Sequence, residues 1–261
     1  MHTMVEIQDV SHVYVTGRGA QLALEDVSLQ IYPGEFVSIV GPSGCGKTSL
    51  LSLIAGLDFP TKGNVFVDGE RVTGSSSRIG YMLQQDYLFP WRTILDNACM
   101  GLELTNQLNE ASRSRVVRML EGMGLEGTER LFPHQLSGGM RQRVALIRTM
   151  ATEPELFLLD EPFSALDYQT KLQLEDLVVD TLKAHEKTAI LVTHDLSEAL
   201  AVSDRVFVMN RNPGSIRRVF DVPEPIRSAT PFFAREQAGF NDWFHELWKE
   251  LEASDNQTGG I

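Results

Sequence analysis

The chain of 261 residues contains only two cysteines, Cys45 and Cys99. Cys45 lies within a glycine-rich loop, so we expect no structural disulfide, and a reducing compartment fits this cysteine usage. Two cysteines also cannot build a zinc site made of four cysteines.

Long apolar runs are missing as well. No stretch approaches the roughly 20 apolar residues that a membrane-spanning helix needs. The first residues have neither the basic nor the apolar region of a secretory signal. We therefore expect a soluble, cytoplasmic protein. Its length and its hydrophobic content of 43% suit one large domain, or one domain with a subdomain.

Positive charge is scarce, with 23 Lys and Arg against 35 Asp and Glu, and a formal net charge of −12. Nucleic-acid binders normally carry a basic patch, because neutralising phosphates supplies much of their affinity. We expect no nucleic-acid partner. Direct binding to anionic lipid is disfavoured for the same reason, so contact with a membrane would go through a protein partner.

Apolar strands alternate with helices along most of the chain. The expected strands are residues 5–7, 13–15, 27–31, 36–40, 63–67, 79–83, 156–159, 189–192, 206–209 and 216–220. The expected helices are residues 48–55, 113–123, 139–150 and 172–183. This alternation predicts an α/β fold with a parallel sheet covered on both faces. The helical block at residues 93–150 is an insertion into that fold.

The tail, residues 221–261, is acidic and carries one aromatic stripe. Six apolar residues follow the spacing of one helix face: Phe240, Trp243, Phe244, Leu247, Trp248 and Leu251. This pattern predicts an amphipathic helix. The face can pack on the protein's own body or on a dimer mate, or it can dock a partner or serve regulation. We expect residues 254–261 to be disordered.

A glycine-rich loop follows the strand at residues 36–40 and precedes a helix. Its residues are Gly41, Pro42, Ser43, Gly44, Cys45, Gly46, Lys47 and Thr48. They match the phosphate-loop pattern G-x-x-x-x-G-K-T in the required context. Glycines let N–H groups face phosphate oxygens, and the helix N-terminus adds its positive dipole end. We expect Lys47 to reach the β and γ phosphates of a nucleotide, and the Thr48 hydroxyl to ligate Mg²⁺.

Two acidic residues end the buried strand at 156–159. Asp160 is placed to hold Mg²⁺, directly or through water, and Glu161 to polarise an attacking water as a general base. Such positions are functional in parallel sheets because these sheets present their sites at the carboxyl ends of strands.

A second glycine-rich segment, Ser137, Gly138 and Gly139, opens the helix at 139–150. Exposed N–H groups at a helix start form an anion site. The whole string Leu-Ser-Gly-Gly-Met-Arg-Gln-Arg resembles the signature motif of ABC-transporter ATPase subunits. The resemblance covers roughly residues 4–220. It implies a P-loop NTPase (RecA-like) core with an N-terminal antiparallel β subdomain and an inserted α-helical subdomain.

The resemblance assigns further residues. Tyr14 is similar to the aromatic residue that stacks on adenine, and Ser49 follows the phosphate loop. Gln84 resembles the glutamine that contacts Mg²⁺ and the attacking water, although Gln85 leaves a shift by one residue open. Asp167 belongs to a segment, Ser-Ala-Leu-Asp, that resembles the D-loop. His194 resembles the switch histidine that contacts the γ-phosphate.

In this family two subunits pair head to tail around ATP. The resemblance therefore implies a homodimer in which Ser137 and Gly139 of one subunit face the nucleotide held by the phosphate loop of the other. ATP binding would close the dimer and hydrolysis would reopen it. The implied division is an ATPase domain at residues 1–222, with the helical subdomain at about 88–150, and an acidic extension at 223–261.

The segments Leu-Phe-Pro-Trp at 88–91 and Arg-Asn-Pro-Gly at 211–214 resemble the ATPases of nitrate, sulfonate and taurine importers. That resemblance implies an energy-coupling subunit on the cytoplasmic face of the cell membrane. Its partners would be integral permease subunits and, indirectly, a periplasmic or extracellular solute-binding protein. A soluble ABC ATPase, or one for export or lipid transport, is the alternative. Leu83, Asn212 and Ser215 depart from the importer pattern.

Overall fold

The computed structural model describes residues 2–17 and 19–256 of the chain. The chain divides into two compact units, and each is described by itself. Unit 1 comprises Met1–Ser76 and Glu175–Ile261, and unit 2 comprises Ser77–Leu174. None of the helices within the described residues is long and apolar enough to cross a membrane.

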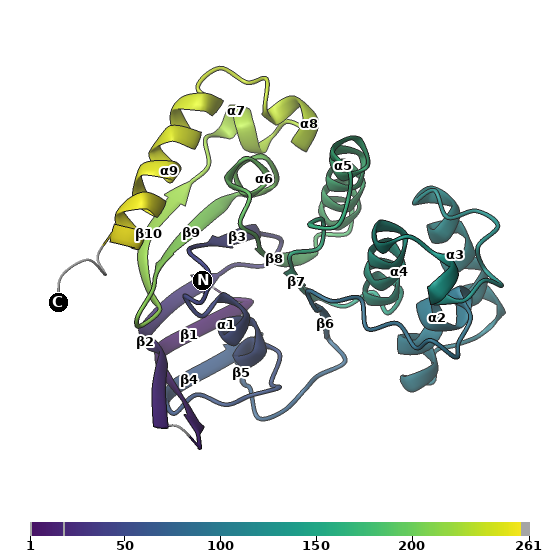
Figure 1. Cartoon of the computed structure of the whole chain (residues 1–261), viewed down its shortest axis with the longest axis horizontal. Coiled ribbons are helices and arrows are strands. Elements are labelled where there is room, and N and C mark those ends of the chain that lie inside the picture. The colour runs from purple at the N-terminus through teal and green to yellow at the C-terminus, as the bar shows by residue number, and fades with distance from the viewer. Residues whose placement is uncertain (1, 18, 257–261) are drawn as a thin grey trace. The chain divides into compact units, whose positions relative to one another are not determined.

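An antiparallel sheet forms the first part of unit 1. Its strands run in the order β2 (Gly19–Ile31), β1 (Val5–Thr16), β4 (Lys62–Val67) and β5 (Glu70–Arg71) (Figure 1). The pairing of β1 with β2 shifts register at several points, and Asp9 in β1 has a φ of 47°. Residues 5–7 and 13–15, which the sequence pattern separates, therefore belong to one strand. The bulges let this strand continue through its polar middle.

Parallel strands form the second part of unit 1. Here β3 (Phe36–Val40) pairs in parallel with both β8 (Thr188–Val192) and β9 (Arg205–Asn210), and β10 (Ser215–Asp221) pairs antiparallel with β9. Every residue of β3 and of β8 is buried. Such strands read as continuous apolar runs because helices cover both faces of a parallel sheet.

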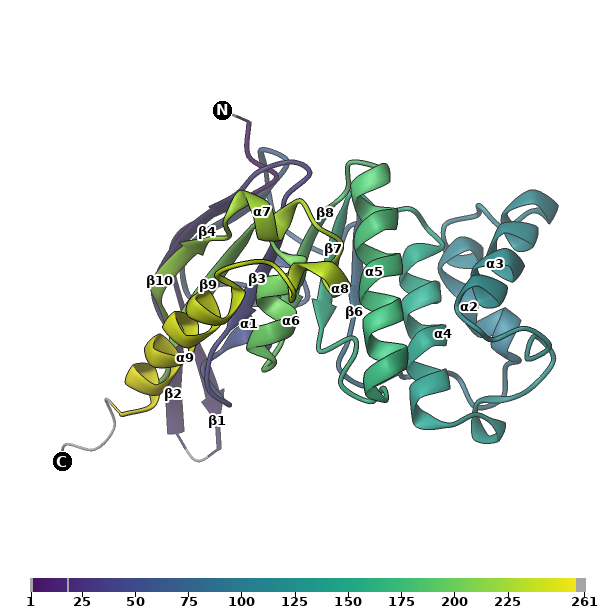
Figure 2. The same cartoon turned by 90° about the horizontal axis from the view of Figure 1, so that it is seen from above.

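The C-terminal segment packs on unit 1 through a shared apolar cluster. Helix α9 (Phe240–Asn256) lies against β9 and against α6 (Leu196–Val202), as two views show (Figures 1 and 2). Phe240 and Leu247 of α9 are buried in a cluster with residues of both elements, and Trp243, Phe244 and Leu251 pack against it. The aromatic stripe thus covers the protein's own body, while Trp248 stays 47% exposed.

Short helices complete unit 1. They are α1 (Lys47–Ile54), α7 (Glu224–Arg227) and α8 (Pro231–Ala234). The sequence pattern does not predict α6, α7 or α8, because each is too short to show a helical period. The expectation of disorder at residues 254–256 is wrong, since α9 runs to Asn256. The rest of that expectation, at residues 257–261, lies outside the described residues.

Unit 2 contains one parallel strand pair and a helical block. β6 (Ile79–Met82) pairs with β7 (Leu156–Asp160). Between them lie α2 (Ile94–Leu104), α3 (Glu110–Gly122), a 3₁₀ turn (Pro133–Gln135) and α4 (Gly138–Met150). Thr93, Asn109 and Ser137 cap the three α-helices with side-chain oxygens. Helix α5 (Tyr168–Ala184) begins in unit 2 and ends in unit 1. The predicted combination of parallel strands, antiparallel sheet and helical block is confirmed.

Leu247→Ala should lower the stability of unit 1 by about 3 kcal/mol, because it leaves a cavity in a closed core. Leu247 is fully buried, whereas Trp248 on the same helix is half exposed. Trp248→Ala is therefore the matched control and should change stability much less. Chemical unfolding followed by circular dichroism measures both variants. Equal shifts of the two midpoints would show that α9 does not pack as described.

Candidate functional site

The glycine-rich loop at residues 41–48 connects β3 to α1. Helix α1 begins at Lys47, and the residue before it, Gly46, has a φ of 95°. Gly44 also has a positive φ, of 77°. A Cβ on Gly46 would lie only 2.6 Å from Leu24 Cδ2. The loop therefore needs glycine at Gly46 for both conformation and space, and it presents backbone N–H groups at a helix start, where anions bind.

Lys47 lies buried over this loop. Its Nζ donates hydrogen bonds to the carbonyl oxygens of Gly41, at 2.7 Å, and of Pro42, at 3.0 Å. The Sγ of Cys45 lies 3.6 Å from the same Nζ. Burial raises the pKa of the Cys45 thiol, although the Lys47 charge acts in the opposite direction. The loop thus holds a positive charge close to its own backbone.

Tyr14 stands on β1 beside the start of α1. Its hydroxyl donates a hydrogen bond to Ser49 Oγ at 3.1 Å, and its ring is 38% exposed. The buried His12 ring meets the Tyr14 ring edge-on, with centroids 4.5 Å apart. The contact and the hydrogen bond hold an exposed aromatic face next to the phosphate-type loop, where it can stack on a base.

His194 lies two residues beyond the end of β8. Because β3 and β8 are parallel, with Ile39 opposite Val192, their carboxyl ends lie at the same edge of the sheet. His194 is exposed, and Asp195 after it caps α6 through the N–H groups of Ser197 and Glu198. Unit 1 thus brings the phosphate-type loop and His194 to one edge, with Tyr14 and Ser49 beside the loop.

In unit 2, the parallel pair β6 and β7 brings together a glutamine and two carboxylates. Met82 is opposite Leu159, so Gln84 and Glu161 follow neighbouring strand ends. Gln84 Nε2 donates to Glu161 Oε2 at 3.1 Å. Asp160 is buried at the last position of β7, and Glu161 adopts a φ of 50°. Gln84 is thus the glutamine of this segment whose side chain bonds the Glu161 carboxylate.

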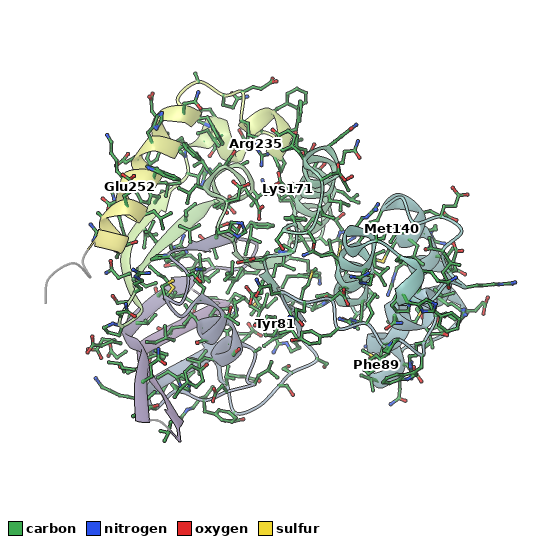
Figure 3. The ribbon with its side chains drawn as sticks, in the orientation of Figure 1. Tyr81, Phe89, Met140, Lys171, Arg235 and Glu252 are labelled. Carbon is green, nitrogen blue, oxygen red and sulfur yellow. The ribbon has the colours of Figure 1, made fainter. Side chains whose placement is uncertain are left out.

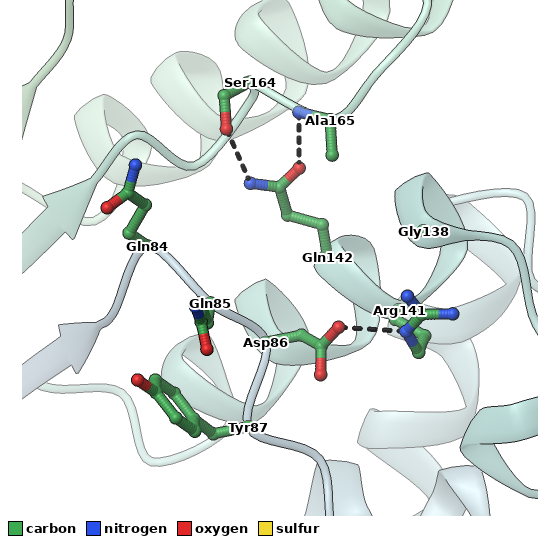
Figure 4. A pocket seen from close by; sticks show the side chains of 9 residues that line it. All are labelled: Gln84, Gln85, Asp86, Tyr87, Gly138, Arg141, Gln142, Ser164 and Ala165. Carbon is green, nitrogen blue, oxygen red and sulfur yellow. Dashed lines mark hydrogen bonds and ion pairs between the residues drawn. The ribbon is translucent and has the colours of Figure 1, made fainter.

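Gln142 on α4 was not assigned a role from the sequence. Its Nε2 donates to the carbonyl oxygen of Glu161 at 2.9 Å, and its Oε1 accepts from the Ala165 N–H at 2.9 Å. Figure 4 shows its amide pointing at Ser164 and Ala165. Gln142 is buried, and it lines a pocket of about 340 Å³ together with Gln84. The sequence signal that could have found Gln142 is its place as a polar residue on the otherwise apolar face of α4.

Two arginines on α4 hold the segment that follows Gln84. Arg141 Nε lies 2.9 Å from Asp86 Oδ2. Arg148 donates to the carbonyl oxygens of Asp86, at 2.8 Å, and Tyr87, at 3.0 Å. Burial lowers the pKa of Arg148. An arginine stays charged even so, because its ordinary pKa lies far above neutrality.

The second glycine-rich segment packs against residues 164–167 of the same unit. A Cβ on Gly139 would lie 3.2 Å from the Ala165 carbonyl oxygen. Ser137 is exposed and accepts from the Met140 N–H at 3.2 Å, and Gly138 is exposed beside it. Asp167 is also exposed, and hydrogen bonds from Thr170 lower its pKa. This face offers helix-start N–H groups to solvent.

Gly214 is a further residue without a role from the sequence. A Cβ at this position would lie 2.0 Å from the Cys45 carbonyl oxygen. Its backbone N–H donates to Ala23 O at 3.0 Å, and its carbonyl oxygen accepts from Glu25 N at 2.9 Å. The segment at 211–214 therefore backs the phosphate-type loop directly, so any side chain at Gly214 would displace that loop.

The structure holds no cluster of three or more His, Cys, Asp or Glu side chains among residues 2–17 and 19–256 that could bind a metal alone. Unit 1 offers one candidate donor, the hydroxyl of Thr48, and unit 2 offers two, the amide of Gln84 and the buried carboxylate of Asp160. Mg²⁺ in nucleotide sites is held by this kind of set, completed by phosphate oxygens and water. The residues present therefore fit Mg²⁺ that arrives with a nucleotide.

Comparison with known proteins places these features in one family. The chain matches the family model of the ABC transporter over residues 24–164. It is 46% identical over 255 residues to the uncharacterized ABC transporter ATP-binding protein YtlC of Bacillus subtilis, covering 98% of each chain. It is 40% identical to the nitrate import ATP-binding protein NrtD of Synechocystis, covering 87% of this chain and 85% of that one.

The aliphatic sulfonates import ATP-binding protein SsuB of Bacillus cereus is 39% identical and covers 83% of this chain and 85% of its own. Among solved structures, the ATP-binding cassette MJ0796, a dimer in a post-hydrolysis state bound to ADP and Pi, superposes with a TM-score of 0.78. That structure is 33% identical and covers 84% of this chain and 99% of its own. The chain therefore belongs to the ABC transporter family, as one of its ATP-binding ATPase subunits.

Proposed function

We propose that this ATPase subunit couples ATP hydrolysis to import of a small anion or organic solute through a membrane permease. The observation that carries the hydrolytic part is the hydrogen bond from Gln84 to Glu161, directly after the buried Asp160. A carboxylate held at a strand end in this way is suited to accept a proton from water. The importer part is supported by the nitrate and sulfonate import relatives.

Nucleotide binding is assigned to unit 1 residues. The phosphates would be received by the loop, residues Gly41, Pro42, Ser43, Gly44, Cys45, Gly46, Lys47, Thr48 and Ser49. Every one of these residues except Pro42 has a backbone N–H that can donate to a phosphate oxygen. Lys47 would exchange its carbonyl partners for phosphate oxygens, which bind an ammonium more strongly because they are charged. The exposed Tyr14 ring would stack on the adenine.

Hydrolysis is assigned to three side chains. Glu161 acts as the general base and takes a proton from the attacking water at its carboxylate. Gln84, already bonded to that carboxylate, orients the water, and His194 contacts the γ-phosphate. Thr48, Gln84 and Asp160 would hold Mg²⁺, which neutralises charge on the phosphates during transfer.

The site is completed by a second copy of the chain. Ser137 and Gly138 are exposed at the start of α4, Gly139 follows them half-buried, and the exposed Asp167 lies on the segment beside them. In a head-to-tail dimer they would meet the nucleotide held by the partner subunit, as the dimeric MJ0796 relatives suggest. ATP would close this dimer and hydrolysis would reopen it.

The cellular setting follows from the importer assignment. The ATPase domain would span residues 1–222, with the helical subdomain at about 88–150 and the extension at 223–261. The subunit would sit at the cytoplasmic face of the cell membrane on permease subunits, which receive solute from a binding protein on the other side. Uptake of nitrate, an alkanesulfonate or taurine in cells with and without this subunit tests the solute class.

Glu161→Gln should retain ATP binding but lower hydrolysis by about a hundredfold or more, because an amide cannot accept the proton from water. The variant should also accumulate as a dimer with ATP. Phosphate release and size-exclusion chromatography measure the two effects.

Glu186→Gln is a matched control, since Glu186 is exposed and shares the φ of 50° found at Glu161. It should hydrolyse ATP at the normal rate. Normal turnover in Glu161→Gln would remove Glu161 as the base.

The segment at residues 89–91 should contact the permease. Trp91 is 70% exposed, and its ring lies 5.1 Å from that of Phe89. The buried Asn97 side chain bonds both the N–H of Phe89, at 2.7 Å, and its carbonyl oxygen, at 3.1 Å. A rigidly held exposed aromatic is typical of a binding hot spot.

Trp91→Cys, labelled with a photoactivatable crosslinker, should therefore crosslink to the permease, and this chemistry needs no cysteine on the permease. Cys45 and Cys99 are buried and will not compete. Leu104→Cys is the control, because Leu104 is 75% exposed on α2 of the same unit. Equal crosslinking at both positions, or none at Trp91→Cys, contradicts the assignment.

A further inference from the structure

Arg235, just after α8 in the C-terminal extension, is the centre of a buried polar cluster. Figure 3 marks its position beside α8. Its Nη2 donates to Glu175 Oε2 at 2.7 Å, and its Nη1 donates to the Pro231 carbonyl oxygen at 2.7 Å. Its Nε donates to Ser197 Oγ at 3.2 Å. One guanidinium thus joins the extension to α5 and to α6.

Glu175 makes this cluster costly to disturb. Its side chain is 0% exposed, and the Arg235 side chain is only 15% exposed. A buried carboxylate requires a charged partner in good geometry, since it has lost its hydration. The extension therefore supplies a charged partner for a buried carboxylate of α5.

Ser197 connects the cluster to the candidate site. It belongs to the first turn of α6, and its N–H donates to Asp195 Oδ1 at 2.9 Å. Asp195 in turn donates its own N–H to Thr193 Oγ1 at 3.0 Å. His194 lies between these two residues in sequence, so its backbone is held on both sides.

We propose that Arg235 is a positioning residue for His194. Arg235 fixes the first turn of α6 by its hydrogen bond to Ser197. This turn is bonded to the capping Asp195, the residue after His194, and so determines where the His194 side chain meets the nucleotide. This inference rests on the proposed role of His194 at the γ-phosphate. It gives the C-terminal extension a part in hydrolysis without any contact with the nucleotide.

Ser197→Ala is the sharpest test, because it removes the link to α6 and leaves the Arg235–Glu175 pair intact. In the full chain, kcat for ATP should fall by about threefold to tenfold, because small displacements of a positioned group are costly. KM should stay unchanged. Arg235→Lys should act in the same direction, since an ammonium keeps the charge but lacks the guanidinium fork. Arg235→Ala is avoided because it removes a charged partner of the buried Glu175 and would destabilise the fold.

Ser228→Ala is the matched control. Ser228 lies in the same extension, and its Oγ bonds only locally, to the Glu224 carbonyl oxygen at 2.6 Å. This variant should keep the normal kcat. Loss of kcat in Ser228→Ala equal to that in Ser197→Ala would show a general effect of the extension and overturn the proposal.

A double-mutant cycle with His194→Ala separates positioning from general stability. If Arg235 acts through His194, Ser197→Ala should have no further effect on the residual hydrolysis of His194→Ala. An effect of undiminished size there would overturn the inference. Normal turnover in His194→Ala would instead remove the proposed role of His194, and the inference with it. A normal kcat in Ser197→Ala, with His194 shown to matter, would refute the inference alone.

The ring resonances of His194 give a readout independent of turnover. In nitrogen-detected spectra of the histidine side chains, Ser197→Ala and Arg235→Lys should shift the His194 signals, and Ser228→Ala should not. Unshifted signals in the first two variants would show that Arg235 does not position His194.

Discussion

Parallel pairing of buried strands is the constraint on which the candidate site depends. In unit 1 it aligns the ends of β3 and β8, and in unit 2 it aligns the ends of β6 and β7. β3, β7 and β8 are buried along their whole length and are almost wholly apolar, with Ser38, Thr188 and the terminal Asp160 as their polar members. Charged and polar groups with chemical roles must therefore follow the strand ends. The pairing then places residues far apart in sequence side by side.

Within unit 2, the buried amide of Gln142 joins the helix that follows the second glycine-rich segment to the acidic residue at the end of β7. Gln142 satisfies the Glu161 carbonyl oxygen and the Ala165 N–H at once. Burying an amide is tolerable only when its polar atoms are bonded, so this geometry is strongly preferred. Helix α4, which begins with the signature glycines, is thereby tied to the backbone of the acid. A displacement of α4 would therefore move the backbone of Glu161. Under the proposed role of Glu161 as general base, this would link the signature segment mechanically to hydrolysis.

Much of the fold and the contiguous motifs could be predicted from the sequence, because each motif carries its own local requirement. The loop at residues 41–48 combines glycines with a lysine between a strand and a helix, and Asp160 and Glu161 end a fully apolar run. Gln142, Gly214 and Arg235 could not be predicted in the same way. Arg235 meets partners 38 and 60 residues away, and Gly214 matters only because Cys45 lies against it. Such contacts arise from tertiary packing, which no local pattern reports.

The C-terminal extension is set apart by its sequence, but the stability of unit 1 depends on its packing. Its composition sets it apart, yet Phe240 and Leu247 fill the same apolar cluster as Val206 and Phe220 of the sheet. Arg217 and Arg218 of β10 pair with Glu250 of α9, and these arginines lower the pKa of that carboxylate. Partly exposed ion pairs of this kind contribute little, so the apolar cluster dominates the attachment. Removing one partner of the buried Arg235–Glu175 pair would still be costly. Deleting the extension would therefore uncover the apolar cluster and remove a charged partner of the buried Glu175. A change in ATPase rate after such a deletion would report loss of structure as much as loss of regulation, whereas single substitutions at the Arg235 cluster separate the two.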